Sequence, residues 1–170
     1  MEQVHGKGWY RAIDFFREAL DLDPTYAAAY SGMAQAYVAL GIFYLSPEEA
    51  YPKAKSAALK AVALDDSLAH AHDQLAAAVL FYEHDWVTVD RELQRALDLD
   101  PNHALTHDVQ SLYLAAMGRL DVAVAAAKRA QSLDQLSVLV TRNVGWAYFN
   151  ARNYEQAIDY CRKTLDMKAT

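Results

Sequence analysis

Histidine is the residue type in this sequence that most readily suggests chemistry, because imidazole binds metals and exchanges protons near neutral pH. The 170 residues include six histidines. His103 and His107 are four residues apart, which places both on one face of a helix, and His70 and His72 lie about 35 residues earlier. One hypothesis is therefore a metal-dependent enzyme that uses these four residues. A zinc site needs three or four converging ligands and a fixed second shell. We favour the alternative that His72 and His107 replace packing aromatics while the other histidines lie at the surface.

The remaining candidates for catalytic residues are better explained by structural roles. Cys161 falls in a helical packing pattern and is expected in the core. The carboxylate pairs Glu48–Glu49 and Asp65–Asp66 lie at expected helix ends or turns, where they are solvated or cap helices. No phosphate-binding loop, dinucleotide fingerprint, G-x-S-x-G or H-E-x-x-H motif occurs. We predict no catalytic residue, no metal and no cofactor.

Composition excludes several functional classes. The net charge is −6, which does not suit direct binding of nucleic acid. No apolar stretch is long enough to span a bilayer, and the N-terminus lacks the apolar core of a signal peptide. A single cysteine allows no internal disulfide and suits a reducing compartment. We therefore expect a cytoplasmic protein with no membrane partner.

A repeated hexapeptide reveals the elements that position these residues. The sequence "ALDLDP" occurs at residues 19–24 and again at 96–101, and degenerate copies begin at Ala61, Ala130 and Thr164. The successive spacings are 42, 35, 34 and 34 residues. A period of 34 is typical of an array of helix–turn–helix repeats, and the first spacing contains an eight-residue insertion. Each front half carries apolar residues at i, i+3, i+4 and i+7, the pattern of an amphipathic helix.

The period predicts an all-α array in which each repeat is an antiparallel pair of helices, A then B. Nine helices are expected, four A and five B. The repeat divisions are 1–24 (helix B of a partial first repeat), 25–66, 67–101, 102–135 and 136–170. At the joints, we expect Asp23 and Asp100 to cap the next helix, with Pro24 and Pro101 in its first turn.

The insertion lies in the segment "GIFYLSPEEAYPKAK". Ser46, Pro47 and Glu49 form a capping-box pattern, which predicts that helix B of the second repeat starts early and is long. Pro52 would kink its extra turn. The simple interpretation is a lengthened helix, and the alternative is a dedicated binding element.

These residues resemble the tetratricopeptide repeat family. The second repeat shows the family's pattern at Tyr30, Met33–Ala34, Tyr37, Ala54, Ala58, Ala61 and Asp66, and the fifth shows it at Thr141, Val144–Gly145, Tyr148, Ala157, Cys161 and Thr164. The chain departs from the pattern where Ala58 and Ala127 replace an aromatic, and where Asp66, Gln135 and Ala169 replace the turn proline. The resemblance implies a right-handed α-solenoid that acts as a non-catalytic scaffold for protein–protein interaction.

Two segments carry a closer resemblance. "SPEEAYPKAKSAALKAVALDDSLAHAH" and "GWAYFNARNYEQAIDYCRKTLDM" are similar to the repeat regions of large bacterial signalling proteins. In those proteins the array follows a winged-helix, nucleotide-cyclase or protein-kinase domain, and no such domain lies in these 170 residues. The resemblance implies a fragment of a larger signalling protein.

The family binds peptides or helices on a groove lined by its A helices. The resemblance places the following residues on that wall: Ser31, Gln35, His70, Asp73, Gln74, Ala77, Phe81, Leu105, Asp108, Leu112, Arg142, Asn143, Trp146 and Phe149. The Lys/Asn/Arg set with which some relatives clamp a C-terminal carboxylate is missing. Trp146 and Arg142 are the expected anchors, since such residues dominate interface energetics. The alternative for Trp146 is ordinary packing between repeats.

The two ends of the array suggest a second mode of action. Trp9, Ile13 and Phe16 at one end, and Tyr154, Ile158 and Leu165 at the other, lack an obvious covering helix. Exposed apolar patches are association sites. The alternative function is therefore a regulatory or oligomerisation segment that acts through self-association of its terminal helices.

Overall fold

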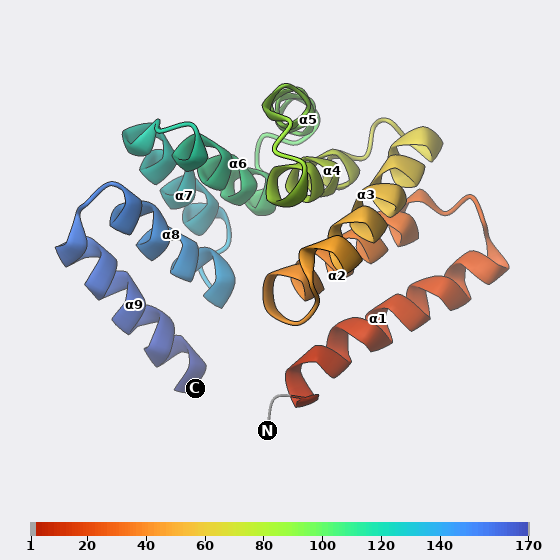
Figure 1. The fold of residues 1–170 in the computed structure, drawn as a ribbon, viewed down its shortest axis with the longest axis horizontal. Helices are drawn as coiled ribbons and strands as arrows, with labels where there is room; N and C mark the ends of the chain where they lie inside the picture. The colour runs from red at the N-terminus through yellow and green to blue at the C-terminus, as the bar shows by residue number, and fades with distance from the viewer. Residues whose placement is uncertain (1–2, 170) are drawn as a thin grey trace. The chain divides into compact units, whose positions relative to one another are not determined.

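The structure is a computed structural model that describes the backbone of residues 3–169 and the side chains of residues 6–167. The described residues form nine α-helices and no strand. They are α1 (Gln3–Leu22), α2 (Ala27–Phe43), α3 (Pro47–Leu64), α4 (Ala69–Tyr82), α5 (Trp86–Leu99), α6 (Ala104–Ala116), α7 (Leu120–Leu133), α8 (Val138–Asn150) and α9 (Tyr154–Ala169) (Figure 1). The all-helical class and the nine expected helices are confirmed. No helix in this described part is both long and apolar enough to traverse a bilayer.

The connections between helices alternate strictly in length. Every turn from an A helix to its B helix has three residues, and every turn from a B helix to the next A helix has four. Within each pair, α2–α3, α4–α5, α6–α7 and α8–α9, the two helices pack against one another. Connections this short leave consecutive helices antiparallel.

The backbone repeats the sequence period in its A-to-B turns. His84, Gly118 and Arg152 have φ angles of 56°, 74° and 59°, and among the described residues these are the positions in the left-handed region. They are spaced 34 residues apart. A left-handed residue directly after a helix lets the chain reverse while its N–H groups satisfy the last carbonyls. The turn between α2 and α3, the two helices that the insertion lengthens, contains no such residue.

The predicted caps at the "LDP" joints are wrong. The N-cap residues of α2 and α6 are Tyr26 and His103, so Pro24 and Pro101 lie in the turns before the helices. Asp23 instead accepts hydrogen bonds from the backbone N–H and the hydroxyl of Thr25, at 2.8 and 2.7 Å. An aspartate that bonds two residues ahead stabilises a turn rather than a helix start.

The insertion lengthens α3 as predicted. Ser46 is the N-cap and Pro47 the first helical residue, and the helix has 18 residues against 14 in α5 and α7. The Ser46 side chain makes no capping hydrogen bond, so the predicted capping box is not formed through Ser46. The helix continues past Pro52, whose predicted kink stays a prediction.

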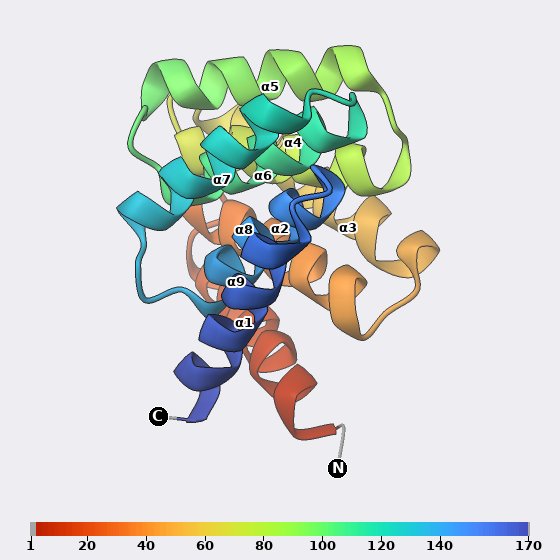
Figure 2. The same ribbon diagram turned by 90° about the vertical axis from the view of Figure 1, so that its left-hand side faces the viewer.

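The chain divides into two compact units, residues 1–101 and residues 102–170. In the first unit, α1 to α5, small residues let the helices approach closely. Ala34, Ala54 and Ala61 are fully buried. A Cβ atom added at Gly41 of α2 would lie 2.9 Å from the Cβ of Ala50 in α3. Figure 2 shows α5 lengthwise above α4, the helix on which it packs.

The second unit, α6 to α9, is built on the same principle. Leu114 packs with Ala123 and Ala126, and Ala127 packs with Val144 and Ala147. The partly buried rings of Tyr148 and Tyr160 stack at 5.6 Å beside the second of these clusters.

The first helix differs from the sequence prediction, whereas the last helix agrees with it. Ile13 of α1 is buried, and Trp9 and Phe16 are partly covered, so these residues belong to the contact of α1 with α2. The exposed apolar residues of α1 are instead Tyr10, Phe15 and Leu22. On α9 the expected exposure of Tyr154, Ile158 and Leu165 is present.

Candidate partner-binding site

The histidines have partners other than a metal. Ser31 Oγ and His70 Nδ1 are 2.9 Å apart, His72 Nδ1 lies 2.7 Å from Glu92, and His103 Nδ1 lies 3.1 Å from Thr106 Oγ1. Within the described residues, no three His, Cys, Asp or Glu side chains are arranged as a metal site. His72 is buried, as a packing residue should be. His84 is exposed, as predicted, whereas His107, His70 and His103 are half-buried, neither core nor surface.

Cys161 is exposed, so its predicted place in the core is wrong. The repeat register puts Cys161 on helix α9, where a following repeat would cover it. Without such a neighbour among the described residues, the same helical position faces solvent.

The predicted wall residues fall into three groups by exposure. Two are exposed, Trp146 and Phe149. Six are half-buried, namely Gln35, His70, Phe81, Leu105, Leu112 and Arg142. Six are buried, namely Ser31, Asp73, Gln74, Ala77, Asp108 and Asn143. The buried polar members connect neighbouring A helices within each unit, and so form the floor beneath the accessible surface.

In the first unit this floor joins α2 to α4. His70 bonds Ser31 through Nδ1, and its Nε2 lies 3.3 Å from Gln74 Nε2. Gln74 also donates to Asp73 Oδ1 at 2.8 Å, while Gln74 Oε1 is buried without a hydrogen-bond partner. A buried polar chain of this kind fixes the relative position of two helices.

In the second unit a polar relay joins α6 to α8. Asn143 donates to Asp108 Oδ2 at 2.7 Å, and Arg142 donates to Asn143 Oδ1 through Nε and a terminal nitrogen at 3.2 and 2.9 Å. The other carboxylate oxygen of Asp108 is buried without a hydrogen-bond partner. The relay holds the guanidinium of Arg142 against α8 and beside the exposed surface.

Burial dominates the electrostatics of this relay. It raises the pKa of Asp108 to about 7, although the Asn143 hydrogen bond and the nearby charge of Arg142 both act to lower it. Burial also lowers the pKa of Arg142, and the Asp108 charge opposes that shift. A carboxyl group whose pKa is raised by burial lies in surroundings that exclude most water.

An aromatic row lies next to the relay. The rings of Trp146 and Phe149 stack with centroids 5.8 Å apart, and the ring of Tyr154 lies 5.9 Å from Phe149. The three residues are 52%, 53% and 54% exposed. Trp146 and Phe149 are three residues apart on α8, and Tyr154 begins α9 directly after the turn. The sequence-based wall omitted Tyr154, because it lies on a B helix, although the constant turn length between Asn150 and Tyr154 places the ring within reach.

The two units differ in charge. Residues 1–101 contain 8 Lys and Arg against 16 Asp and Glu, a difference of −8, whereas residues 102–170 contain 8 against 6, a difference of +2. The aromatic row and Arg142 therefore belong to the less acidic part of the chain.

Comparisons with known proteins place this geometry in context. A tetratricopeptide repeat model matches residues 143–170, most of α8 and α9. No curated protein sequence matches the chain significantly. Among solved structures, the chain is similar to TTC0263, a thermophilic TPR protein of Thermus thermophilus, with a TM-score of 0.72, 19% identity, and coverage of 98% of this chain and 91% of that one.

Two further structures show the same likeness. The crystal structure of MamA gives a TM-score of 0.60 at 23% identity and covers 96% of this chain and 91% of that one. YrrB, described as a TPR protein with an unusual peptide-binding site, gives 0.57 at 25% identity, with coverage of 96% and 79%. The described helices thus have the fold of tetratricopeptide-repeat solenoids, and residues 143–170 match the sequence model of that repeat.

Proposed function

We propose that this chain is a non-catalytic scaffold that binds a peptide or helix of a partner protein on the A-helix faces of its repeats. The observation that carries the proposal is the exposed row of Trp146, Phe149 and Tyr154 beside the anchored guanidinium of Arg142. Aromatic and arginine side chains with restricted freedom are the residues that dominate protein interfaces. The unusual peptide-binding site of YrrB, a protein of similar fold, supports the same kind of partner.

The context of the scaffold belongs to the same proposal. The similarity of its segments to bacterial signalling proteins suggests a cytoplasmic fragment of such a protein, in which another domain supplies the output. The acidic first unit agrees with a protein partner rather than direct contact with nucleic acid or membrane. In that unit the A-helix residues Gln35, His70 and Phe81 are the accessible members of the proposed binding face.

The test is a selection of binding peptides from a random displayed library on the intact chain, followed by calorimetry with the selected peptides. Trp146→Ala should weaken binding at least about tenfold, the effect of removing a hot-spot aromatic. Arg142→Ala should act in the same direction. Both variants should keep the helical circular-dichroism spectrum, because Trp146 is half exposed and Arg142 is only half-buried, so neither substitution removes a side chain from the packed core.

The matched control is Phe15→Ala, which removes a similarly exposed aromatic ring from α1. It should leave the affinity unchanged. If the selected peptides bind the Trp146 and Arg142 variants as tightly as the wild-type chain, this surface is not the binding site.

A second candidate function is self-association through the terminal helices. Ile158 and Leu165 of α9 are exposed, and Leu22 of α1 is 90% exposed. Sedimentation velocity over a wide concentration range tests it: association should increase with concentration and weaken in Leu165→Glu. A monomer at every concentration would exclude this mode of action.

A further inference from the structure

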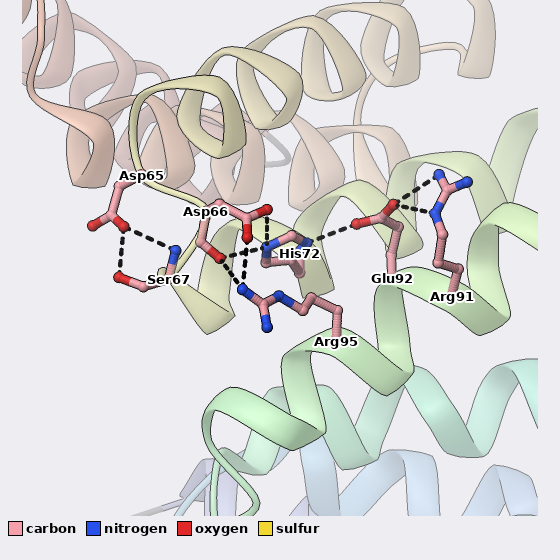
Figure 3. Close-up of polar contacts among 7 residues, drawn as sticks. All are labelled: Asp65, Asp66, Ser67, His72, Arg91, Glu92 and Arg95. Atoms are coloured by element: carbon pink, nitrogen blue, oxygen red, sulfur yellow. Dashed lines mark hydrogen bonds and ion pairs between the residues drawn. The ribbon is translucent and has the colours of Figure 1, made fainter.

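The imidazole of His72 is buried between two hydrogen-bond acceptors (Figure 3). Its Nδ1 lies 2.7 Å from Glu92 Oε2, and its Nε2 lies 3.1 Å from the backbone carbonyl oxygen of Asp66. The ring is only 3% exposed, so water cannot replace either partner. His72 thus joins three pieces of the first unit, namely the turn before α4, α4 itself and α5.

The chemistry of these partners determines how many protons the ring needs. A backbone carbonyl only accepts hydrogen bonds, and so does an ionised carboxylate. A neutral imidazole carries one N–H and can satisfy only one of them. With Glu92 ionised, both contacts are hydrogen bonds only when the ring carries a proton on each nitrogen and is a cation.

The surrounding charges complete a network that suits this cation. Arg91 donates to Glu92 Oε1 at 3.0 and 2.8 Å, and Arg95 donates to the carboxylate and carbonyl of Asp66 at 2.6 and 3.2 Å. The Asp66 carboxylate also lies 3.5 Å from His72 Nε2. The two anions that face the ring are therefore each paired with an arginine of α5.

We propose that protonated His72 is a pH-sensitive clasp that holds α5 onto α4 and onto the turn at Asp66. The apolar contact of α5 with α4, through Val89, Leu93 and Ala96, provides the rest of the attachment. The charged residues that the clasp uses on α5 are Arg91, Glu92 and Arg95. The hydrogen bond that links this group to α4 is the contact of Glu92 with the His72 ring.

The direction of the effect follows from the proton count. The clasp is complete while His72 is protonated and Glu92 is ionised. As the pH rises and the ring loses one proton, a bare nitrogen faces an acceptor, either Glu92 or the Asp66 carbonyl, and that buried contact becomes repulsive. Attachment of α5 is therefore strongest at mildly acidic pH and weakens on the alkaline side.

Two measurements on the intact chain test the clasp. Ring ¹⁵N chemical shifts of His72 should show two protonated nitrogens at mildly acidic pH and one protonated nitrogen on the alkaline side. Amide hydrogen exchange should show that α5 loses at least about tenfold of its protection over the same range, relative to α2. A neutral ring throughout, or equal pH dependence of α5 and α2, would overturn the proposal.

Variants separate the clasp from a merely structural role. His72→Gln and Glu92→Gln should each remove the extra pH dependence of α5 protection. The control is His107→Gln, at the equivalent position of the next repeat, which should leave that dependence intact. If all three variants behave like the wild type, the clasp is excluded. If a variant fails to fold, the ¹⁵N chemical shifts of His72 in the wild-type chain still test the proposal, because that measurement needs no substitution.

Discussion

At the scale of single residues, Asp108 is the clearest case of a group held in an unfavourable state. Its carboxyl group is buried with one oxygen unpaired, and its pKa of about 7 lies well above the ordinary value of 3.8. Folding therefore favours the protonated form. The stability associated with this group is complete below about pH 3.8, falls as the pH rises toward 7, and stays low above that value.

Asp108→Asn should remove this pH dependence. At pH 8 the variant should be more stable than the wild type, by up to about 4 kcal/mol for a shift of about three pKa units. Denaturant unfolding of both chains between pH 4 and 8 is the measurement. Curves that stay parallel across this range would show that Asp108 ionises freely in the folded protein.

Several residues show what sequence alone could and could not predict. The positions of the apolar and small residues were predictable, because the 34-residue period fixes which face of each helix is buried. Cys161 and Ile13 were misplaced because their burial depends on whether a neighbouring helix covers them, which the pattern does not state. Both Asp108 and Asn143 were placed on the wall, but the hydrogen bond between them was not predicted. The two residues are 35 positions apart, and the sequence pattern does not show which distant side chains meet.

At the scale of helices and turns, close approach between α2 and α3 depends on Gly41. A Cβ at this position would lie 2.9 Å from the Cβ of Ala50 and from the ring of Tyr51. Gly41→Ala should therefore destabilise the protein by about 1–3 kcal/mol, the usual cost of overpacking. Thermal and denaturant unfolding would measure the loss.

The control for Gly41 is Gly8, in the exposed face of α1, where an added Cβ meets nothing within 4 Å. Gly8→Ala should stabilise the chain by up to about 1 kcal/mol, because alanine favours helix more than glycine does. Equal effects of the two substitutions would show that the α2–α3 contact tolerates the extra methyl group.

The left-handed turn residues make a separate prediction. Arg152 has a φ of 59°, a conformation that costs a residue with a side chain about 1 kcal/mol but costs glycine little. Arg152→Gly should raise the free energy of unfolding by about 0.5–1 kcal/mol. Arg152→Ala, which keeps the Cβ, should show no such gain, and a gain as large as that of glycine would mean that the arginine side chain, rather than the backbone, causes the cost.

Helix ends show the limit of local patterns. "LDP" reads as a cap followed by a first-turn proline, yet the helices begin three residues after the proline, at Ala27 and Ala104. At the first joint, the carboxylate of Asp23 instead accepts a hydrogen bond from the N–H of Thr25, two residues ahead, and so stabilises the turn. Whether an aspartate caps a helix or a turn depends on the length of the connection, which the repeat keeps constant at four residues.

At the scale of the whole molecule, charge is unevenly divided between the two units. The difference of −8 in residues 1–101 implies repulsion among like charges, whereas residues 102–170 are almost balanced. Salt screens such repulsion over about 10 Å at 0.1 M. Raising NaCl from low to moderate concentration should therefore increase hydrogen-exchange protection in α2 and α3 more than in α7 and α8. An equal response of both units would show that local ion pairs, rather than net charge, set the salt dependence.

The fold of the whole chain was predictable because repetition multiplies a weak signal, and five imperfect copies in phase define one architecture. The partner was not predictable. The accessible row of Trp146, Phe149 and Tyr154 indicates an aromatic contact surface, but it does not identify the protein that binds there.

The left-handed residues at positions 84, 118 and 152 also have a consequence for how such a chain can change over time. Each marks the same point in a copy of the same backbone, so a gene recombined between two successive codons of this set gains or loses one complete repeat and leaves every turn intact. The eight-residue insertion lies beside the one A-to-B turn that lacks such a residue among the described positions. Designed chimaeras joined at His84, Gly118 or Arg152 should therefore exchange repeats as units, while junctions in the α2–α3 turn should not.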